Sequence, residues 1–370
     1  MVEATPTVSI LVLGLVLLLP LLLIPQFKGW IKTSQSAGIL SRLRLWRRPT
    51  QSSEIVSLRV YPIKSCRGFE VHHSAIKEHG LDLDRRWMLV DAETNSFLTI
   101  RQIPNMTLIG TALSADGEDL IITIPTANAD SGAEDPTVQT VRIPAHPSPE
   151  WLAANTSVAP VTIWRKDTDG YVYKDSVNSP FSAFLGRPVA LVYKGPTPRV
   201  MGGNGAPHLL GRVQSVGFPD VFPVLIASEA SLAELNARLG QAGVDPITVE
   251  RFRPNIIIRG ETPWSEDSWK LVRISNAAKS GSEKSVASLD LDIVARCARC
   301  QVPNVDPDTA VQHKKQPWDT LVSYRRIDEG IKYKPCFGML SAPRGEGVVE
   351  VGMRLEVLEE TTEHRYVTGF

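Results

Sequence analysis

Cysteine is scarce in this chain of 370 residues, and the chain has no net charge. Its four cysteines are too few to hold together a disulfide scaffold of this length, and they favour a reducing compartment with free thiols. Forty basic and forty acidic residues cancel, which argues against a nucleic-acid-binding protein that depends on bulk positive charge. The sequence also lacks internal repeats and the phosphate-binding pattern G-x-x-x-x-G-K-[ST], so a classical nucleotide-binding enzyme is disfavoured.

The first 53 residues differ in composition from the rest of the chain. Residues 4–27 carry no charge, and the leucine-rich run 8–24 with its flanks reaches the ~20 residues that span a ~30 Å hydrocarbon layer. We predict a membrane anchor at 1–27 rather than a cleaved signal peptide, because the chain opens with Met-Val-Glu and the run ends without small residues. All six charged residues of the linker 28–53 are basic. Positive charge stays on the cytoplasmic side, so the body is expected to face the cytosol.

From residue 54 onward the pattern is typical of a β-rich α+β protein. Apolar residues alternate at Val56, Leu58 and Val60, as in a half-buried strand. Ser228 caps a predicted helix over 229–239 that Gly240 ends. Further elements are predicted as strands at 87–90, 120–124, 189–193, 255–258 and 289–295, a short helix at 180–185 between Ser179 and Gly186, a loop at 127–136 and a polar insertion at 276–288.

Cys297 and Cys300 form a C-x-x-C pair between a predicted strand and a turn that contains proline and aspartate. A structural zinc site would need Cys66 and Cys336 as further ligands, although neither belongs to a second pair. A thioredoxin-like pair would begin a helix, which Pro303 opposes.

Two other interpretations of the pair remain open from spacing alone. Both thiols can be buried residues without chemistry, since free cysteine is common in protein cores. Alternatively, one of them is a thiolate ligand for a soft, redox-active metal, with Arg296 and Arg299 nearby to favour the charged form of the sulfur.

Several further motifs occur in a fixed order along the chain. They are Y-P-I-K-S-C-R-G at 61–68, D-R-R-W at 84–87, R-Q at 101–102, S-E-A-S-L at 228–232, F-R-P-N at 252–255, and the C-x-x-C pair followed by V-D-P-D-T at 305–309. Together they resemble the MOSC-domain family, and most closely its mitochondrial amidoxime reducing components, which are molybdenum enzymes. The resemblance covers residues 54–370. It implies two β-barrel-like lobes, a MOSC N-terminal lobe at 54–195 and a MOSC lobe at 196–370, with the cofactor held between them.

The resemblance implies a molybdenum-molybdopterin cofactor and a role for individual residues. Cys300, the second cysteine of the pair, corresponds to the protein ligand of molybdenum and is the expected catalytic residue. Basic and amide side chains suit the anionic phosphate and polar edge of the pterin, although each alone could be a surface charge or a turn residue. The residues expected to contact the cofactor are Lys64, Ser65, Arg85, Asp220, Arg253, Asn255, Ala298 and Arg299.

Two positions depart from the family pattern. The family commonly has Asp-Thr-Ser-Pro before the helix that Ser228 caps, whereas this chain has Asp220-Val221-Phe222-Pro223 and keeps only the acid and the proline. Backbone amides could still serve there. Near the C-terminus Leu340 replaces the family's aromatic residue, so any hydroxyl contact is lost.

The resemblance also implies a reaction, namely the two-electron reduction of N-hydroxylated compounds such as amidoximes, hydroxylamines and N-oxides to amines or amidines and water. The chain has no flavin, haem-attachment or ferredoxin-type motif. It therefore needs separate electron donors, which in the family are cytochrome b5 and NADH-cytochrome b5 reductase. The expected address is the outer mitochondrial membrane, with the endoplasmic reticulum membrane as the alternative.

Other functions remain open from the sequence. One is a sulfur carrier that uses Cys300 as a persulfide, or a non-catalytic protein that binds the molybdenum cofactor. Another is a zinc-stabilised membrane scaffold. Metal content distinguishes them, because a carrier would lack stoichiometric molybdenum and a scaffold would contain zinc.

Overall fold

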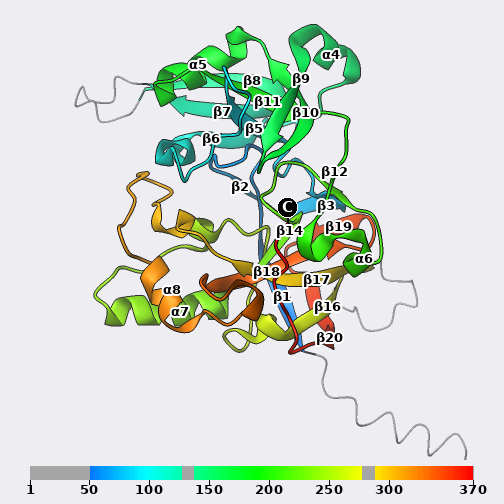
Figure 1. Cartoon of the computed structure of the whole chain (residues 1–370), viewed down its shortest axis with the longest axis vertical. Helices are drawn as coiled ribbons and strands as arrows, with labels where there is room; N and C mark the ends of the chain where they lie inside the picture. Colours follow the sequence, from blue (N-terminus) through cyan, green and yellow to red (C-terminus); the bar gives the residue numbers. More distant parts are fainter. Residues whose placement is uncertain (1–50, 127–136, 277–287, 370) are drawn as a thin grey trace, which may run out of the picture. The chain divides into compact units, whose positions relative to one another are not determined.

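The computed structural model describes residues 51–126, 137–276 and 288–369 (Figure 1). The predicted membrane anchor and nearly all of the basic linker lie outside the described residues, as do the predicted loop 127–136 and most of the insertion 276–288. Within the described ranges, no helix has the length and apolar character needed to cross a membrane.

Seven strands form a closed barrel in the order β15, β14, β18, β17, β16, β20 and β1, and β1 pairs back with β15. Neighbouring strands are antiparallel except β14 and β15, which are parallel. The short strand β2 (Phe69–Val71) pairs with β1 beside this ring. The barrel strands are β1 (Ser52–Val60), β14 (Val224–Ser228), β15 (Ile256–Ile258), β16 (Trp269–Ser275), β17 (Ser288–Ala298), β18 (Cys336–Pro343) and β20 (Arg354–Glu360).

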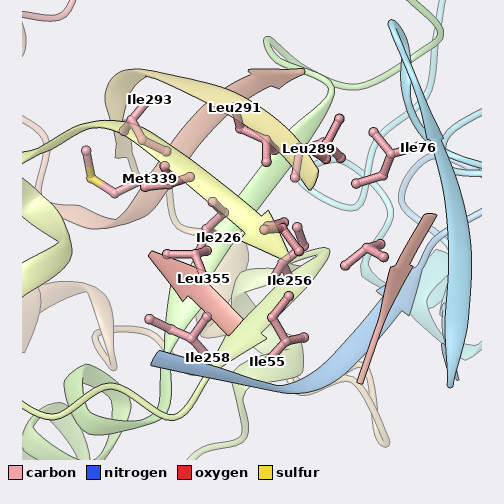
Figure 2. Close-up of a cluster of buried hydrophobic side chains, with 14 of the residues drawn as sticks. Ile55, Ile76, Ile226, Ile256, Ile258, Leu289, Leu291, Ile293, Met339 and Leu355 are labelled. Atoms are coloured by element: carbon pink, nitrogen blue, oxygen red, sulfur yellow. The ribbon is translucent and has the colours of Figure 1, made fainter. Parts of the chain in front are cut away.

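Aliphatic side chains fill the barrel (Figure 2). They come from every strand of the ring, and β-branched isoleucine predominates among them, as expected for a pleated surface that is buried on one side. Burial of this many aliphatic groups is the main stabilisation of the barrel. The labelled members in Figure 2 are Ile55, Ile76, Ile226, Ile256, Ile258, Leu289, Leu291, Ile293, Met339 and Leu355.

Strand β1 was predicted with Val56, Leu58 and Val60 on its buried face, and the structure confirms Leu58 and Val60. Val56 is only partly buried, and Ile55 enters the core instead. The pairing of β1 with β15 shifts register between Ile55 and Ser57, and such a bulge reverses the alternation of side chains.

Two further sheets pack over a second core, which includes Trp87 from one sheet, Ile122 from the other and Phe181 from the helix α5. One sheet has the order β5, β11, β10, β9, and the other has the order β6, β7, β8. Helix α5 contacts β11 and β7 (Figure 1). The bounds are β5 (Trp87–Asp91), β6 (Gly110–Leu113), β7 (Asp119–Pro125), β8 (Val138–Pro144), α4 (Pro149–Asn155), β9 (Thr156–Ile163), β10 (Lys166–Tyr173), α5 (Asp175–Leu185) and β11 (Val189–Lys194).

The fold is therefore β-rich α+β, as predicted, with one closed barrel among the described strands. The N-terminal lobe was predicted to be barrel-like. Its four-stranded sheet has β5 and β9 at its edges, and bridges from Phe97 to Val90 of β5 and from Ser96 to Thr162 of β9 link these two edges. The sheet of β6, β7 and β8 packs on the same core. The remaining elements are β3 (His73–Lys77), β4 (Gly80–Leu81) and β19 (Gly347–Glu350) in one small sheet, the pair β12 (Arg199–Val200) and β13 (Ser215–Val216), and the helices α6 (Pro207–Leu210), α7 (Glu229–Gln241) and α8 (Trp318–Tyr324).

The two predicted helices form, with different ends. Helix α7 begins as predicted, because Ser228 accepts a hydrogen bond from the backbone of Ser231, but it runs through Gly240 to Gln241. Helix α5 ends at Gly186, whose left-handed backbone terminates it, but it begins at Asp175 rather than after Ser179. Pro180 lies inside this helix and did not mark its start.

Candidate functional site

A cavity of about 470 Å³ is lined by residues from both halves of the described chain. Such clefts between packed elements commonly hold ligands. All of the site residues predicted from the sequence line this one cavity, namely Lys64, Ser65, Arg85, Asp220, Arg253, Asn255, Ala298, Arg299 and Cys300.

Positive charge dominates the described lining. Seven basic side chains face a single carboxylate, that of Asp220. A ligand with anionic groups is favoured by this balance, because charge-assisted hydrogen bonds from Arg and Lys are strong in a partly desolvated site. The basic residues are Lys64, Arg85, Arg101, Arg251, Arg253, Arg299 and Lys334.

Asp220 joins two of these cations. Its carboxylate forms a short ion pair with the ammonium of Lys64, and it accepts a hydrogen bond from Nη2 of Arg101 at 2.8 Å. Burial opposes ionisation of Asp220, but the positive charges of Lys64 and Arg101 hold its pKa below the usual range. Burial lowers the pKa of Lys64 to about 8, and the charge of Asp220 acts against that shift.

Arg85 and Arg253 lie against the buried ring of Tyr61, with guanidinium carbons 4.5 Å and 4.3 Å from its centroid. Arg85 is fixed by Asp84 at 2.5 Å and by the backbone oxygen of Arg253 at 2.9 Å. Nη2 of Arg253 is buried and finds no hydrogen-bond partner within the described part of the chain. A donor of this kind is costly unless a ligand accepts from it.

Three residues of the cavity have a left-handed backbone, which is uncommon for residues other than glycine. They are Ser65, Arg85 and Arg253, with φ angles of 70°, 48° and 55°. Such strained positions concentrate at ligand sites, where the surrounding structure enforces them. Each of the three residues belongs to a different motif, so the motif sequences encode local geometry as well as side-chain chemistry.

The C-x-x-C pair spans the end of β17 and the loop after it. Arg299 fixes this loop, because its guanidinium donates to the backbone oxygens of Phe337 at 2.7 Å and Phe252 at 2.9 Å. The Cys300 sulfur accepts a hydrogen bond from Nε of Arg101 at 3.2 Å. Burial raises the pKa of the neighbouring Cys297 thiol.

All four cysteines are free thiols. Cys66 and Cys336 are buried, and burial raises the pKa of each thiol to about 12. Among the described residues, no group of three or more His, Cys, Asp or Glu side chains comes together to hold a metal. The Cys₄ zinc site is therefore wrong, and two of the four cysteines, Cys297 and Cys300, line the cavity.

Comparison with known proteins identifies two domain types in this chain. Residues 52–188 match the MOSC N-terminal beta barrel domain, and residues 213–356 match the MOSC domain. Human mitochondrial amidoxime reducing component 2 is 30% identical over 329 residues, which cover 85% of this chain and 88% of that protein. The chain belongs to the MOSC-domain family.

Two other MOSC-domain relatives extend this comparison. Human mitochondrial amidoxime-reducing component 1 is 28% identical over 88% of this chain and 92% of its own length. Molybdenum cofactor sulfurase of Oryza sativa subsp. japonica is 30% identical over 77% of this chain, but the match covers only 32% of that longer protein. The MOSC family is thus associated with molybdenum-cofactor proteins of more than one kind.

Asn255 of the F-R-P-N motif lines the cavity, yet its side-chain amide already forms hydrogen bonds with backbone groups. Its oxygen accepts from the backbone nitrogen of Leu225 at 3.1 Å, and its nitrogen donates to the backbone oxygen of Arg59 at 3.2 Å. The side chain is 1% exposed. It therefore joins β14 to β1, which flank β15 on its two sides, a structural function that the motif did not indicate.

The two departures from the family pattern place apolar side chains in the cavity wall. Val221, Phe222 and Leu340 all line it, and Phe222 and Leu340 are buried. Close by, a Cβ atom at Gly338 would lie 2.7 Å from the backbone oxygen of Ile226, and its φ of +76° disfavours other residues. The glycine of this run is thus required by packing, whereas the residue at 340 can be aliphatic.

Several cavity residues were not predicted as part of the site. Arg101 was noted in the R-Q motif without a function, although it contacts both Cys300 and Asp220. Arg251 donates to the carboxylate of Asp306 at 2.7 Å, so the V-D-P-D-T turn fixes a cavity side chain. No sequence signal marks further lining residues such as Trp164, Lys334 and Tyr366.

Proposed function

We propose that this MOSC-domain protein binds a molybdenum-molybdopterin cofactor in the cavity and reduces N-hydroxylated compounds by two-electron removal of oxygen. The observation that carries the proposal is the Cys300 thiol in the wall of a cavity whose lining has seven basic side chains and one carboxylate. A thiolate is a preferred protein ligand for soft metals, and the basic lining suits an anionic phosphate. The relatives named amidoxime-reducing components support the reaction class.

The residues of the cavity fit this cofactor in charge and hydrogen bonding. The orphaned Nη2 of Arg253 offers a donor that no described residue uses, and Arg85 presents a second guanidinium against the same Tyr61 ring. Together with Lys64 and Ser65, these residues would hold the phosphate and the polar edge of the pterin, with Cys300 as the metal ligand. Bound there, the cofactor would supply the two-electron chemistry.

The chain itself contributes orientation and exclusion of water. Arg299 fixes the loop that carries Cys300, and the ion pair of Lys64 with Asp220 holds one wall of the cavity. Phe222 and Leu340 line the cavity with apolar surface. An apolar wall strengthens polar interactions with a bound substrate because water is displaced.

Electrons are proposed to come from cytochrome b5 and NADH-cytochrome b5 reductase, because the sequence has no motif for a flavin, haem or iron–sulfur group of its own. The uncharged run 4–27 and its basic flank support an anchor in the outer mitochondrial membrane, with the body facing the cytosol. The names of the amidoxime-reducing relatives are compatible with a mitochondrial address.

A sulfur carrier with a persulfide on Cys300 is the second candidate, supported by the 30% identity to a molybdenum cofactor sulfurase. Elemental analysis of the purified full-length protein separates the two. The reductase should contain about one molybdenum per chain and reduce benzamidoxime with an artificial electron donor. Protein that is free of molybdenum after expression with an intact cofactor supply, and that carries a cyanide-labile sulfur, would favour the carrier.

A further inference from the structure

Arg101 connects the N-terminal half of the described chain to the proposed metal ligand. Its Nε donates to the sulfur of Cys300 at 3.2 Å, and its Nη2 donates to Oδ2 of Asp220 at 2.8 Å. One guanidinium thus bridges a sulfur and a carboxylate through adjacent N–H groups. Only the fork geometry of arginine permits this arrangement, because an ammonium is a single point charge.

The direction of the Nε–H group is fixed from several sides. The guanidinium carbon lies over the Trp164 ring, 5.0 Å from its centroid, so the ring packs against the group. Asp220 is itself held by the buried ammonium of Lys64. The backbone around Asp220 is held by Arg199, which donates to the carbonyl oxygens of Gly217 at 3.2 Å and Pro219 at 2.9 Å.

A hydrogen bond from a cation to a coordinating sulfur withdraws electron density from that sulfur. The sulfur then donates less to the metal, the lower oxidation state is favoured, and the reduction potential rises. We propose that Arg101 is a positioning residue that sets the reduction potential of the metal through the sulfur of Cys300. The inference rests on the proposed function, since it requires the metal to be bound by Cys300.

The test compares the full-length holoprotein with Arg101→Gln and Arg101→Lys. At a fixed applied potential, the ratio of reduced to oxidised metal in Arg101→Gln should fall about tenfold, which is about 30 mV for a two-electron couple. A potentiometric titration followed by the optical absorption of the bound cofactor measures this ratio. Arg101→Lys keeps the charge but cannot hold both partners, so its potential should shift in the same direction by a smaller amount.

Arg187→Gln is the matched control, because Arg187 also pairs with an aspartate, Asp91 at 2.5 Å, but does not line the cavity. Its potential should equal that of the wild type. An unchanged potential in Arg101→Gln at normal molybdenum content would overturn the inference and leave the proposed function standing. If Arg101→Gln does not retain metal, Arg101→Lys decides, and a wild-type potential there overturns the inference. A wild-type protein without molybdenum would overturn the proposed function, and the inference with it.

Discussion

Lys64 and Asp220 form an ion pair in the cavity wall, with the lysine side chain 5% exposed and the aspartate side chain 41% exposed. Asp220 is the single carboxylate among the described residues that line the cavity. It is therefore the counter-charge that permits the buried ammonium, which in turn also donates to the backbone oxygen of Phe218 at 3.1 Å. Cation-rich sites of this kind depend on such compensation even before a ligand enters.

Replacing this carboxylate should destabilise the fold. Asp220→Asn leaves Lys64 and Arg101 without their counter-charge, and the free energy of unfolding should fall by roughly 1–3 kcal/mol, a range that allows for the partial exposure of Asp220. Urea unfolding of the apoprotein measures the change. Glu359→Gln is the control, because its ion pair with Lys270 is exposed on both sides and should contribute at most about 0.5 kcal/mol.

The buried carboxyl group of Glu266 should make the stability of the protein depend on pH. Its carboxyl group is 1% exposed, one oxygen accepts from Ser231 at 2.6 Å, and the other has no partner within the described residues. Burial raises its pKa from the ordinary 4.5 to about 7. Between these two pH values the unfolded chain loses this proton while the folded protein keeps it, so stability falls as pH rises through that window.

Glu266→Gln should remove this dependence. The variant should resemble the wild type near the ordinary glutamate pKa of 4.5 and exceed its stability about one pH unit above the raised pKa, by at most roughly 3 kcal/mol if the whole shift is recovered. Urea midpoints at the two pH values measure the difference. The same substitution at the exposed Glu329 should leave the pH profile unchanged. A parallel offset of Glu266→Gln at both pH values would contradict the assignment of the slope to this carboxyl.

A variant of Asn255 tests whether this residue stabilises the fold even when no cofactor is bound. Asn255→Ala would leave the backbone N–H of Leu225 and the oxygen of Arg59 without their side-chain partner, and the apoprotein should lose roughly 2–4 kcal/mol of stability. Thermal unfolding without cofactor tests this directly. Asn155→Ala, which removes one bond to the Trp151 oxygen, should cost about 1 kcal/mol or less. If Asn255→Ala were as stable as the wild type, the hydrogen bonds from the Asn255 amide to the backbone would contribute little to stability.

Every predicted site residue lines one cavity, and all of them except Asp220 belong to the ordered motifs. In three of these motifs the local sequence also adopts a left-handed backbone, at Ser65, Arg85 and Arg253. The contacts of single side chains could not be predicted from the motifs. Asn255 has the chemistry of a ligand, yet its amide bonds to backbone groups of two strands that are distant in sequence. Arg101 meets Cys300 only after the chain has folded, since 199 positions separate them.

The fold was predicted best where its signals are local. Ser228 marked the start of α7 because capping depends on neighbouring residues. The closure of the barrel depends on β1 pairing with β15, far along the chain, and the bulge near Ile55 depends on that same pairing. Periodicity within one strand contains no information on either feature.

The membrane topology stays a prediction from the sequence. If residues 1–27 anchor the protein in the outer mitochondrial membrane with the basic residues of 28–53 on the cytosolic side, protease added to intact mitochondria should release the body and leave a short embedded stub. Immunoblotting with an antibody against the body measures this, and a protein of the intermembrane space serves as the control for an intact outer membrane. Protection of the body until the outer membrane is ruptured would refute the orientation.

The two cysteines of the C-x-x-C pair should differ in function. Cys300 contacts Arg101 beside Asp220, whereas burial raises the pKa of the Cys297 thiol and disfavours its thiolate. Cys300→Ala should therefore lose molybdenum and benzamidoxime reduction by at least about two orders of magnitude, while Cys297→Ser should retain metal and a substantial part of the activity. Circular dichroism of both variants checks that the fold survives. Wild-type turnover in Cys300→Ala would exclude the Cys300 sulfur as the metal ligand. If Cys297→Ser lost the metal and Cys300→Ala kept it, Cys297 would be the ligand instead.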